Sequence, residues 1–397
     1  MQLRYFLLLL TCAIAFSVTA QTTVPEQQTQ KLAPTEVNIL SSYYSQDGDN
    51  AAVTGGIGNE HLTDFTPTVI VNVPLDTVTD LNVNFGMDYY TSASSDNVDP
   101  NSISSASSAD TRYHLNVSYT RRNSARRVVK SVMIGGSTEY DVQSLQLGLS
   151  WSKESRNLNR EFTLAGQVFY DSWTLIYPKE LRGKTWLNEK VRQSYSVSAI
   201  LTQVINKRMQ GAVMADLVYQ TGLLSTPFHR VYFQNSDQPL VEQLPSNRFK
   251  IPLGLRLNYY LNDYLTSRLY YRFYTDDWGI TANTLEVELP IKVGPFFTLY
   301  PLYRFHTQTA ADYFAPYNAH IAGEEFFTSD YDLSDFSSHK AGVGLRYSPL
   351  MGIKEFGLPF SKKRSLFKSI DLRYANYWRS NGLKAYIIST DLGFSIP

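Results

Sequence analysis

The chain has 397 residues, with 36 basic and 36 acidic side chains and a formal net charge of +0. This length is enough for two soluble domains or one large barrel, and the balanced charge argues against a nucleic-acid-binding protein, which usually carries a basic excess. Aromatic residues make up 14% of the chain, with 28 Tyr, 21 Phe and 5 Trp. Such a content is typical of a membrane barrel with aromatic girdles at both interfaces.

The first twenty residues have the anatomy of a secretory signal peptide. Arg4 provides the positive charge, the apolar run from Tyr5 to Phe16 is too short to span a bilayer, and Val18-Thr19-Ala20 is a small-residue cleavage signal. We therefore expect residues 1–20 to direct export through the Sec pathway and to be removed.

The only cysteine, Cys12, lies inside this apolar run. A lipoprotein interpretation of Leu9-Leu10-Thr11-Cys12 stays open, although Thr11 is large for that motif and the preceding apolar run is short. Without the signal peptide, the mature chain has no disulfide, no thiol nucleophile and no cysteine metal site. The polar segment 21–35, with Pro25 and Pro34, predicts a periplasmic lead-in.

Apolar residues alternate with a period of two from Glu36 onward, which favours strands over helices. Leu255 and Leu257, for example, alternate with Arg256 and Asn258. The alternating segments are about ten residues long, the length of a tilted membrane strand, and no later apolar run reaches the roughly 18 residues of a membrane helix. We expect about sixteen strands, at residues 36–44, 64–73, 80–92, 111–121, 127–137, 141–153, 160–172, 191–205, 209–220, 248–260, 265–275, 279–292, 297–307, 337–348, 367–377 and 382–395.

The lengths of the connections also alternate. Outer-membrane barrels have short periplasmic turns and long extracellular loops. Long connections here join odd-numbered predicted strands to the strands that follow them: 45–63, 93–110, 173–190, 221–247 and 308–336. The exception is 349–366, which is long on the short-turn side, so either the strand count slips there or that turn is unusual.

These patterns predict an all-β fold, an antiparallel transmembrane β-barrel of about 16 strands over residues 36–397, in the bacterial outer membrane. A soluble β-sandwich has shorter strands. A β-solenoid shows a fixed repeat of 20–50 residues, and the sequence contains none.

The parity of each strand assigns its residues to lipid or to the lumen. Folding strands 265–275 and 279–292 about the Asp277-Trp278 turn places Arg268 nearly opposite Glu286. A charge on the lipid face near the midplane costs about 2–4 kcal/mol, so charged residues are expected to face inward. The lumen-facing candidates are Arg256, Arg268, Arg272, Glu286, Glu288, Arg304, Arg346 and Arg373.

These inward charges have two interpretations. They form an arginine-lined constriction that selects solutes, or a salt-bridged set of side chains that fills and stiffens the barrel. The first interpretation predicts a channel or porin-like transporter for small solutes or ions. The second predicts a closed barrel that serves as a surface anchor or docking partner for other envelope proteins.

Hard metal ligands are concentrated in segment 47–64. Asp47, Asp49, Glu60 and Asp64 are candidate ligands for Ca²⁺, which prefers oxygen donors. The spacing does not fit an EF-hand loop, and ordinary turn chemistry explains Asp and Gly equally well. We expect no other cofactor.

Catalytic motifs are missing from the sequence. No histidine forms an i,i+4 zinc pair, and no Gly-x-Ser-x-Gly nucleophile elbow is present, so we expect no enzymatic activity. Asp276-Asp277-Trp278-Gly279 predicts a tight extracellular hairpin with Trp278 near the outer membrane interface.

Three runs carry a family resemblance: the acidic, glycine-rich segment 42–56, the segment 271–280 with its Asp-Asp-Trp-Gly hairpin, and the segment 303–314. Together they resemble an uncharacterised bacterial family of outer-membrane barrels, domain of unknown function 3570. The resemblance covers the whole mature chain and implies the fold and the outer-membrane location, but no activity.

Several partners are expected from the sequence. The alternating last strand, Lys384 to Ile396, resembles the signal read by the barrel-insertion machinery, although the chain ends in Pro397 instead of an aromatic residue. The acidic loops 45–63 and 93–110 are candidates for contact with lipopolysaccharide through bridging divalent ions. Outer-membrane lipid and small-solute cargo complete this set.

Overall fold

The structure is a computed structural model, and the chain divides into two units, Met1–Leu32 and Ala33–Pro397. The predicted signal peptide 1–20 and most of the lead-in 21–35 lie outside the described residues. The described residues are 32–92, 110–175, 177, 179–181, 189–234, 236, 238–359 and 363–397.

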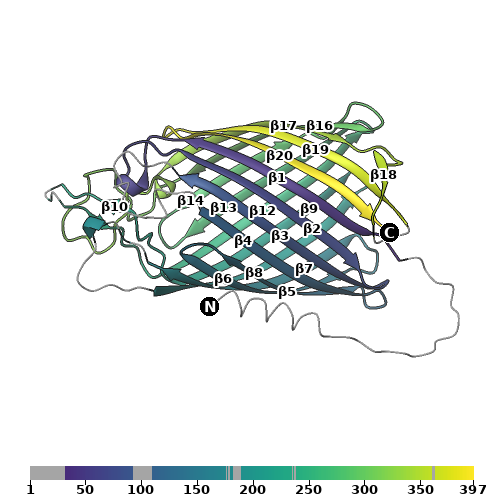
Figure 1. The fold of residues 1–397 in the computed structure, drawn as a ribbon, viewed down its shortest axis with the longest axis horizontal. Helices are drawn as coiled ribbons and strands as arrows, with labels where there is room; N and C mark the ends of the chain where they lie inside the picture. Colours follow the sequence, from purple (N-terminus) through teal and green to yellow (C-terminus); the bar gives the residue numbers. More distant parts are fainter. Residues whose placement is uncertain are drawn as a thin grey trace. The chain divides into compact units, whose positions relative to one another are not determined.

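The second unit is a closed antiparallel barrel of sixteen long strands (Figure 1). Each strand pairs with its neighbours along the chain, and β1 also pairs with β20, which closes the barrel and leaves no free edge. The strands are β1 (Thr35–Asp47), β2 (Leu62–Pro74), β3 (Thr79–Ser92), β4 (Asp110–Asn123), β5 (Val128–Thr138), β6 (Val142–Glu154), β7 (Arg160–Thr174), β8 (Glu189–Asn206), β9 (Met209–Gly222), β12 (Asn247–Asn262), β13 (Leu265–Asp276), β14 (Thr281–Glu288), β16 (Phe297–Gln308), β17 (Phe336–Tyr347), β19 (Arg364–Arg379) and β20 (Lys384–Ile396).

The predicted strands are confirmed, with two informative differences. The predicted strand 279–292 is broken, because Pro290 has no backbone N–H to donate; β14 ends at Glu288 and β15 covers only Ile291–Lys292. The strand count does not slip at 349–366. Instead, this turn folds back as β18 (Lys354–Gly357), which pairs with the start of β19.

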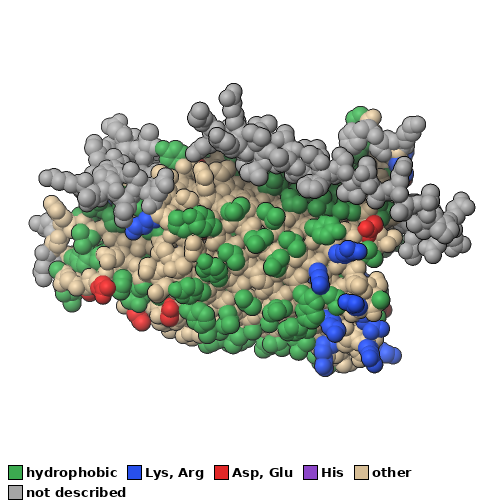
Figure 2. Space-filling model, turned by 90° about the horizontal axis from the view of Figure 1, so that it is seen from below, with side chains coloured by type: hydrophobic (Ala, Val, Ile, Leu, Met, Phe, Trp, Pro, Cys, Tyr) green, Lys and Arg blue, Asp and Glu red, His purple; other side chains and the backbone are tan. Residues whose placement is uncertain are grey.

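The outer surface of the barrel is apolar around its middle. Alternate residues of each strand, such as Ile134, Leu145 and Leu149, are exposed although they are large and aliphatic. Figure 2 shows such side chains spread over one flank, with basic side chains gathered at the end where the short turns lie. Among the described residues, no helix is long and apolar enough to cross a membrane. The apolar flank is the face that a barrel presents to lipid.

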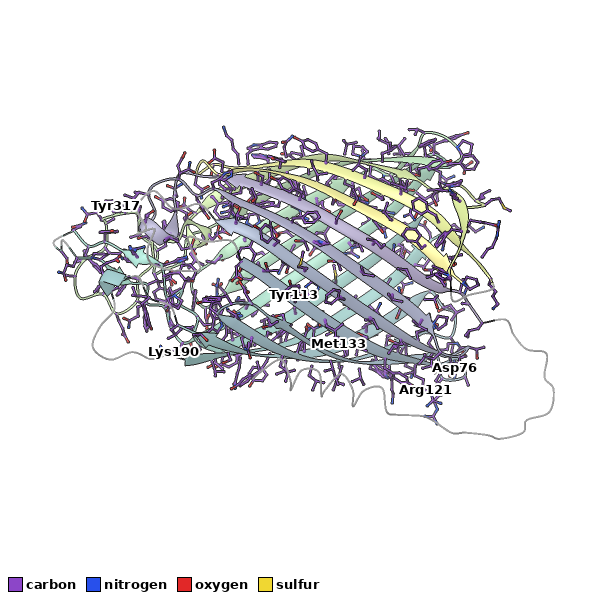
Figure 3. All side chains as sticks on the ribbon, in the orientation of Figure 1. Asp76, Tyr113, Arg121, Met133, Lys190 and Tyr317 are labelled. Atoms are coloured by element: carbon purple, nitrogen blue, oxygen red, sulfur yellow. The ribbon has the colours of Figure 1, made fainter. Side chains whose placement is uncertain are left out.

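Three of the loops at the other end fold together into what we call the cap, formed by residues 48–61, 223–246 and 309–335 (Figures 1 and 3). It contains the short elements η1 (Ala52–Thr54), β10 (Arg230–Val231), β11 (Leu240–Val241) and η4 (Tyr331–Leu333). The hydrophobic core cluster of the described residues lies here and consists of Val231, Phe233 and Phe327. Among the residues that the structure describes, the barrel wall therefore encloses no such apolar cluster.

Candidate functional site in the barrel lumen

One half of the lumen carries a dense set of basic side chains, which we call the arginine wall. Its members alternate with lipid-facing residues on β12, β13, β16, β17 and β19. The side chains of Arg268, Arg304 and Arg373 remain 50%, 43% and 42% exposed although they point into the barrel. The space before them is therefore accessible to water. The arginine wall consists of Arg256, Arg268, Arg272, Arg304, Lys340, Arg346 and Arg373.

Ion pairs join part of this wall into a network. Glu288 accepts from both Arg268 (2.7 Å) and Arg373 (3.0 Å), and Arg373 also donates to Asp371 (3.1 Å). Arg304 donates through Nε to Glu286 (2.6 Å). These ion pairs involve residues of β13, β14, β16 and β19, so Arg268, Glu286, Glu288, Arg304 and Arg373 do lie near an oppositely charged partner in the lumen.

The predicted opposition of Arg268 and Glu286 is wrong by two residues. In the register of β13 and β14, Arg268 lies opposite Glu288, and Tyr270 lies opposite Glu286. The last cross-strand pair before the turn is Thr275 with Thr281. The loop between them is therefore longer than the predicted tight turn at Asp277-Trp278. The alternation of faces survives this shift because an even displacement keeps each side chain on its own face.

Three arginines of the wall have no acidic partner within 4 Å among the described residues: Arg256, Arg272 and Arg346. All three are exposed. The guanidinium of Arg256 lies 5.7 Å from the ring centroid of Tyr270, a cation–π contact that orients the side chain without neutralising it. The wall therefore presents uncompensated positive charge to the lumen.

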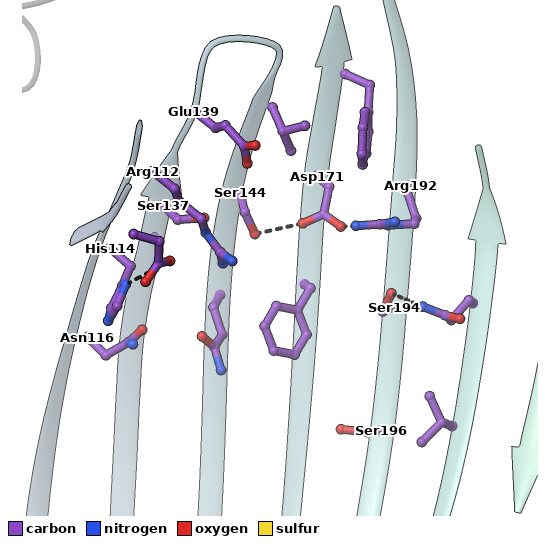
Figure 4. Close-up of a pocket in the computed structure, with 18 residues that line it drawn as sticks. Arg112, His114, Asn116, Ser137, Glu139, Ser144, Asp171, Arg192, Ser194 and Ser196 are labelled. Atoms are coloured by element: carbon purple, nitrogen blue, oxygen red, sulfur yellow. Dashed lines mark hydrogen bonds and ion pairs between the residues drawn. The ribbon is translucent and has the colours of Figure 1, made fainter. Parts of the chain in front are cut away.

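A pocket of about 660 Å³ lies on the opposite wall, lined from β3–β9 (Figure 4). At its centre the Asp171 carboxylate accepts from Ser144 Oγ (2.6 Å) and from Arg192 Nε (2.8 Å). Phe169 and Trp173 add aromatic surface, and the buried indole N–H of Trp173 has no acceptor among the described residues. None of the residues that line this pocket is among the predicted site residues.

The rim of the pocket is acidic. Glu139, in the turn between β5 and β6, has its pKa raised to about 7 by burial and by the negative charges of Asp141 and Asp88. Asp88 of β3 also lies beside His114 of the neighbouring strand β4, with 3.8 Å between Asp88 Oδ2 and His114 Nδ1. The two walls of the lumen thus differ in charge: mainly basic on β12–β19, mixed and carboxylate-rimmed on β3–β9.

The cap holds a second group of charges, which are buried instead of exposed. His229 Nδ1 lies 3.5 Å from Glu242 Oε1 and 3.9 Å from Asp330 Oδ2. Glu242 also accepts from Thr328 Oγ1 (2.5 Å) and from the backbone N–H of Thr226 (2.6 Å). The negative charges of Glu242 and Asp330 raise the pKa of His229 although burial alone would lower it.

The cap is also attached to the lumen wall. Arg379 is the last residue of β19, at its loop end, and its inward-facing side chain pairs with Asp332 of the cap. The side-chain amide of Gln308, at the loop end of β16, donates to the Ser334 carbonyl (2.7 Å). Elsewhere, Arg230 ties the cap to Glu180 in the loop between β7 and β8, and it joins two of the cap loops by donating to the Val53 carbonyl (2.6 Å). These contacts hold the cap over the barrel mouth.

The predicted calcium ligands do not converge. Asp47 and Asp49 are exposed, and Asp64 accepts from Thr66 Oγ1 (3.0 Å) on the lumen side of β2. Burial, together with the charges of Asp332 and Asp330, raises the pKa of Glu60 to about 7. Two groups of described residues bring three ligand atoms within range of one ion: His229 with Glu242 and Asp330, and Asp110 with Glu139 and Asp141. Neither contains a predicted ligand, so calcium binding at segment 47–64 stays a prediction.

The predicted position of Trp278 is wrong. Its side chain is only 3% exposed and lies under the cap instead of at the lipid interface. The indole N–H donates to the Asn247 carbonyl (3.0 Å), the Arg248 guanidinium lies 4.2 Å from the ring centroid, and the Tyr313 ring packs edge-on. Loop 309–335 covers this hairpin, and nothing in the local sequence indicates such a cover.

A closed barrel with an apolar flank and a charged, water-accessible interior defines the class of outer-membrane β-barrel proteins. Within that class the chain belongs to the family described as "Protein of unknown function (DUF3570)", whose profile matches residues 9–356. No curated protein matches the chain in sequence.

Several solved outer-membrane proteins are similar in structure to this chain at low TM-scores. A bacterial polysaccharide outer-membrane secretin is 12% identical, covers 93% of this chain and 100% of its own, and has a TM-score of 0.47. OpdK of Pseudomonas aeruginosa is 7% identical, with coverage of 91% and 99% and a TM-score of 0.41. A BenF-like porin of Pseudomonas fluorescens Pf-5 is 7% identical, with coverage of 92% and 99% and a TM-score of 0.42. At these values the likeness concerns the fold alone.

Proposed function

We propose that this protein is a water-filled outer-membrane channel for small solutes, and that its arginine wall favours anions. The observation that carries the proposal is the exposure of the wall: Arg268, Arg304 and Arg373 keep 50%, 43% and 42% of their side-chain surface accessible inside the barrel. Side chains that filled the barrel would be buried against one another. A barrel of about sixteen strands is wide enough for an aqueous channel.

The electrostatics of the lumen give the channel its preference. Arg256, Arg272 and Arg346 carry charge that no described carboxylate neutralises at close range, and they face a wall whose rim carries Glu139 and Asp88. Opposite charges on facing walls create a field across the path of a solute, and the surplus on the basic side raises the local concentration of anions. The long loops face outward and the short turns face the periplasm, as in other outer-membrane barrels.

The test is ion selectivity of the refolded protein in a planar bilayer. Replacing Arg256, Arg272 and Arg346 together by Gln removes three charges without breaking an ion pair. One charge at about 8 Å in water contributes about 0.5 kcal/mol, so the triple variant should lower the anion-to-cation permeability ratio about tenfold.

A matched triple variant controls for the loss of net charge. Arg156, Lys207 and Arg208 are exposed in the short turns, outside the lumen, and their replacement by Gln should leave the ratio unchanged. Conducting channels with the same selectivity in both triples would remove the arginine wall from the mechanism.

The cap supports a second candidate, a closed barrel that acts as a docking partner for other envelope proteins. Its core and its ties to Arg379 and Gln308 keep folded protein over the barrel mouth. This candidate predicts a folded, inserted barrel that conducts no current, and it predicts that conductance stays absent when Arg379→Gln loosens the cap.

A further inference from the structure

A cluster of basic side chains faces outward at the short-turn end of β4–β7. We call Arg121, Lys130, Lys153 and Arg160 the basic belt. Each is exposed and shares the parity of a lipid-facing residue on its own strand: Tyr119, Val132, Trp151 and Phe162. Figure 2 shows basic side chains gathered at this end, and Figure 3 places Arg121 there. The belt therefore faces the membrane boundary and not the lumen.

On β6 and β7 the sign of charge differs between the two faces of the strand. On β6, Lys153 points outward and the next residue, Glu154, points inward; on β7, Arg160 points outward and Glu161 inward. Glu154 and Glu161 lie opposite each other on the lumen side. The outward positions carry positive charge alone. Such segregation is expected where the outer face meets an anionic surface.

Two members of the belt form a like-charge pair. Arg121 of β4 lies directly opposite Lys130 of β5, and Lys130 lies opposite Trp151 of β6, two residues before Lys153. Directly opposed side chains in a sheet have Cβ atoms about 4.5–5.5 Å apart, and like charges at that distance destabilise the pair. An anion shared between them removes this repulsion.

Acidic residues in the described part of the chain offer this belt little compensation. Asp76, in the β2–β3 turn, is the carboxylate that faces Arg121, and it accepts from the backbone N–H of Val78 (2.7 Å). Arg160 donates to Gln203, an uncharged side chain (2.7 Å). Among the described residues, Arg121, Lys130 and Lys153 form no ion pair within 4 Å. The positive charge of the basic belt is therefore available to a partner outside the chain.

We infer that the basic belt binds the phosphate groups of anionic phospholipids in the leaflet at the turn end of the barrel. Long basic side chains at a membrane interface extend toward the headgroups, and Trp151 and Phe162, whose rings pack edge-on at 6.3 Å, mark the headgroup level on the same face. The expected ligand is a glycerophospholipid with a net negative headgroup. This preference for anionic lipid does not depend on whether the barrel conducts ions.

Trp151 provides a probe for this site. The refolded protein is placed in phosphatidylcholine vesicles that contain increasing fractions of dibrominated phosphatidylglycerol or dibrominated phosphatidylcholine. The fluorescence of Trp151 is obtained by subtracting the emission of the Trp151→Phe variant from the emission of the unmodified protein. We expect half-maximal quenching at about fivefold lower mole fraction of the anionic lipid, which corresponds to roughly 1 kcal/mol in total, the contribution of a single basic side chain near a charged surface.

Two controls define the outcome. Trp378, which is lipid-facing at the loop end, should show equal quenching by both lipids, measured through Trp378→Phe. The triple variant Arg121→Gln, Lys130→Gln, Lys153→Gln should give half-maximal quenching of Trp151 at about the same mole fraction of either brominated lipid. The control variant Lys207→Gln with Arg208→Gln should keep the preference for the anionic lipid. Folding is checked by heat-dependent migration on gels. Equal quenching of Trp151 by both lipids in the folded protein, or a preference that survives the triple variant, would overturn the inference.

Discussion

The lumen and the cap both concentrate charged side chains, but they give them different surroundings. In the arginine wall, Arg268 is paired with Glu288 and is still 50% exposed. In the cap, the paired side chains of His229 and Glu242 are 14% and 2% exposed. Exposed pairs contribute about 0–1 kcal/mol to stability, whereas breaking a buried pair costs about 3–5 kcal/mol. The difference indicates that lumen charges are available to solutes and cap charges hold loops together.

The largest expected effect comes from the core of the cap. Phe327 packs edge-on against Phe233 at 5.0 Å between ring centroids, and Phe327→Ala should cost about 3–5 kcal/mol of local stability because a buried aromatic leaves a cavity. Hydrogen exchange should accelerate in 223–246 and 309–335 and stay unchanged in the barrel strands. Protection of the loops equal to that of the unmodified protein would show that the cap has no cooperative core.

A smaller effect is expected where the cap meets the barrel. Arg379→Gln removes the ion pair with Asp332 and the cation–π contact with Phe336, so segment 330–335 should become more accessible to protease by several-fold. Arg364→Gln, which loses an exposed pair with Glu355, is the matched control. Equal digestion of the two variants would contradict a tie between cap and wall.

Removing an acid from the lumen should sharpen the selectivity instead of abolishing it. Glu288 neutralises part of Arg268 and Arg373. Glu288→Gln removes the acidic partner of Arg268 and one of the two partners of Arg373, which keeps Asp371. The anion-to-cation permeability ratio should therefore rise about twofold, the effect of one charge at about 8 Å in water. A fall in this ratio would contradict the assignment of the arginine wall.

The smallest expected effect is a pH dependence from Glu139. Since its pKa is raised to about 7, this carboxyl is mostly neutral at pH 6 and ionised at pH 8. The negative charge gained at the pocket rim should lower the anion preference as pH rises, by slightly less than the roughly twofold effect of one full charge, because ionisation between these pH values is incomplete. Glu139→Gln should flatten this change between pH 6 and 8, and an identical slope in that variant would assign the titration to another group.

The sequence predicted the barrel better than the cap for a physical reason. Period-two alternation is a local signal, so it placed Arg256 and Arg373 on the lumen face without knowledge of the partners. The same parity assigns Asp171 and Arg192 inward, but it cannot show that they lie directly opposite each other on the neighbouring strands β7 and β8, with Arg192 over the Trp173 ring. Alternation also does not predict the length of the turn between β13 and β14, which decides which residue lies opposite Arg268.

The cap is built from contacts between residues distant in the chain. Glu242 meets Thr328, and Arg230 meets the carbonyl of Val53. Such contacts depend on how long loops pack once the barrel has brought their ends together, and no periodicity records them. Trp278 illustrates this, because its burial is caused by loop 309–335 and not by its own hairpin.

The most direct test of the account is the reversal potential of single refolded barrels under a salt gradient. The account predicts stepwise openings with a preference for anions, which the combined replacement of Arg256, Arg272 and Arg346 by Gln reduces. A folded, inserted barrel that stays silent, or one that prefers cations with the arginine wall intact, would contradict the proposal of an anion-favouring channel.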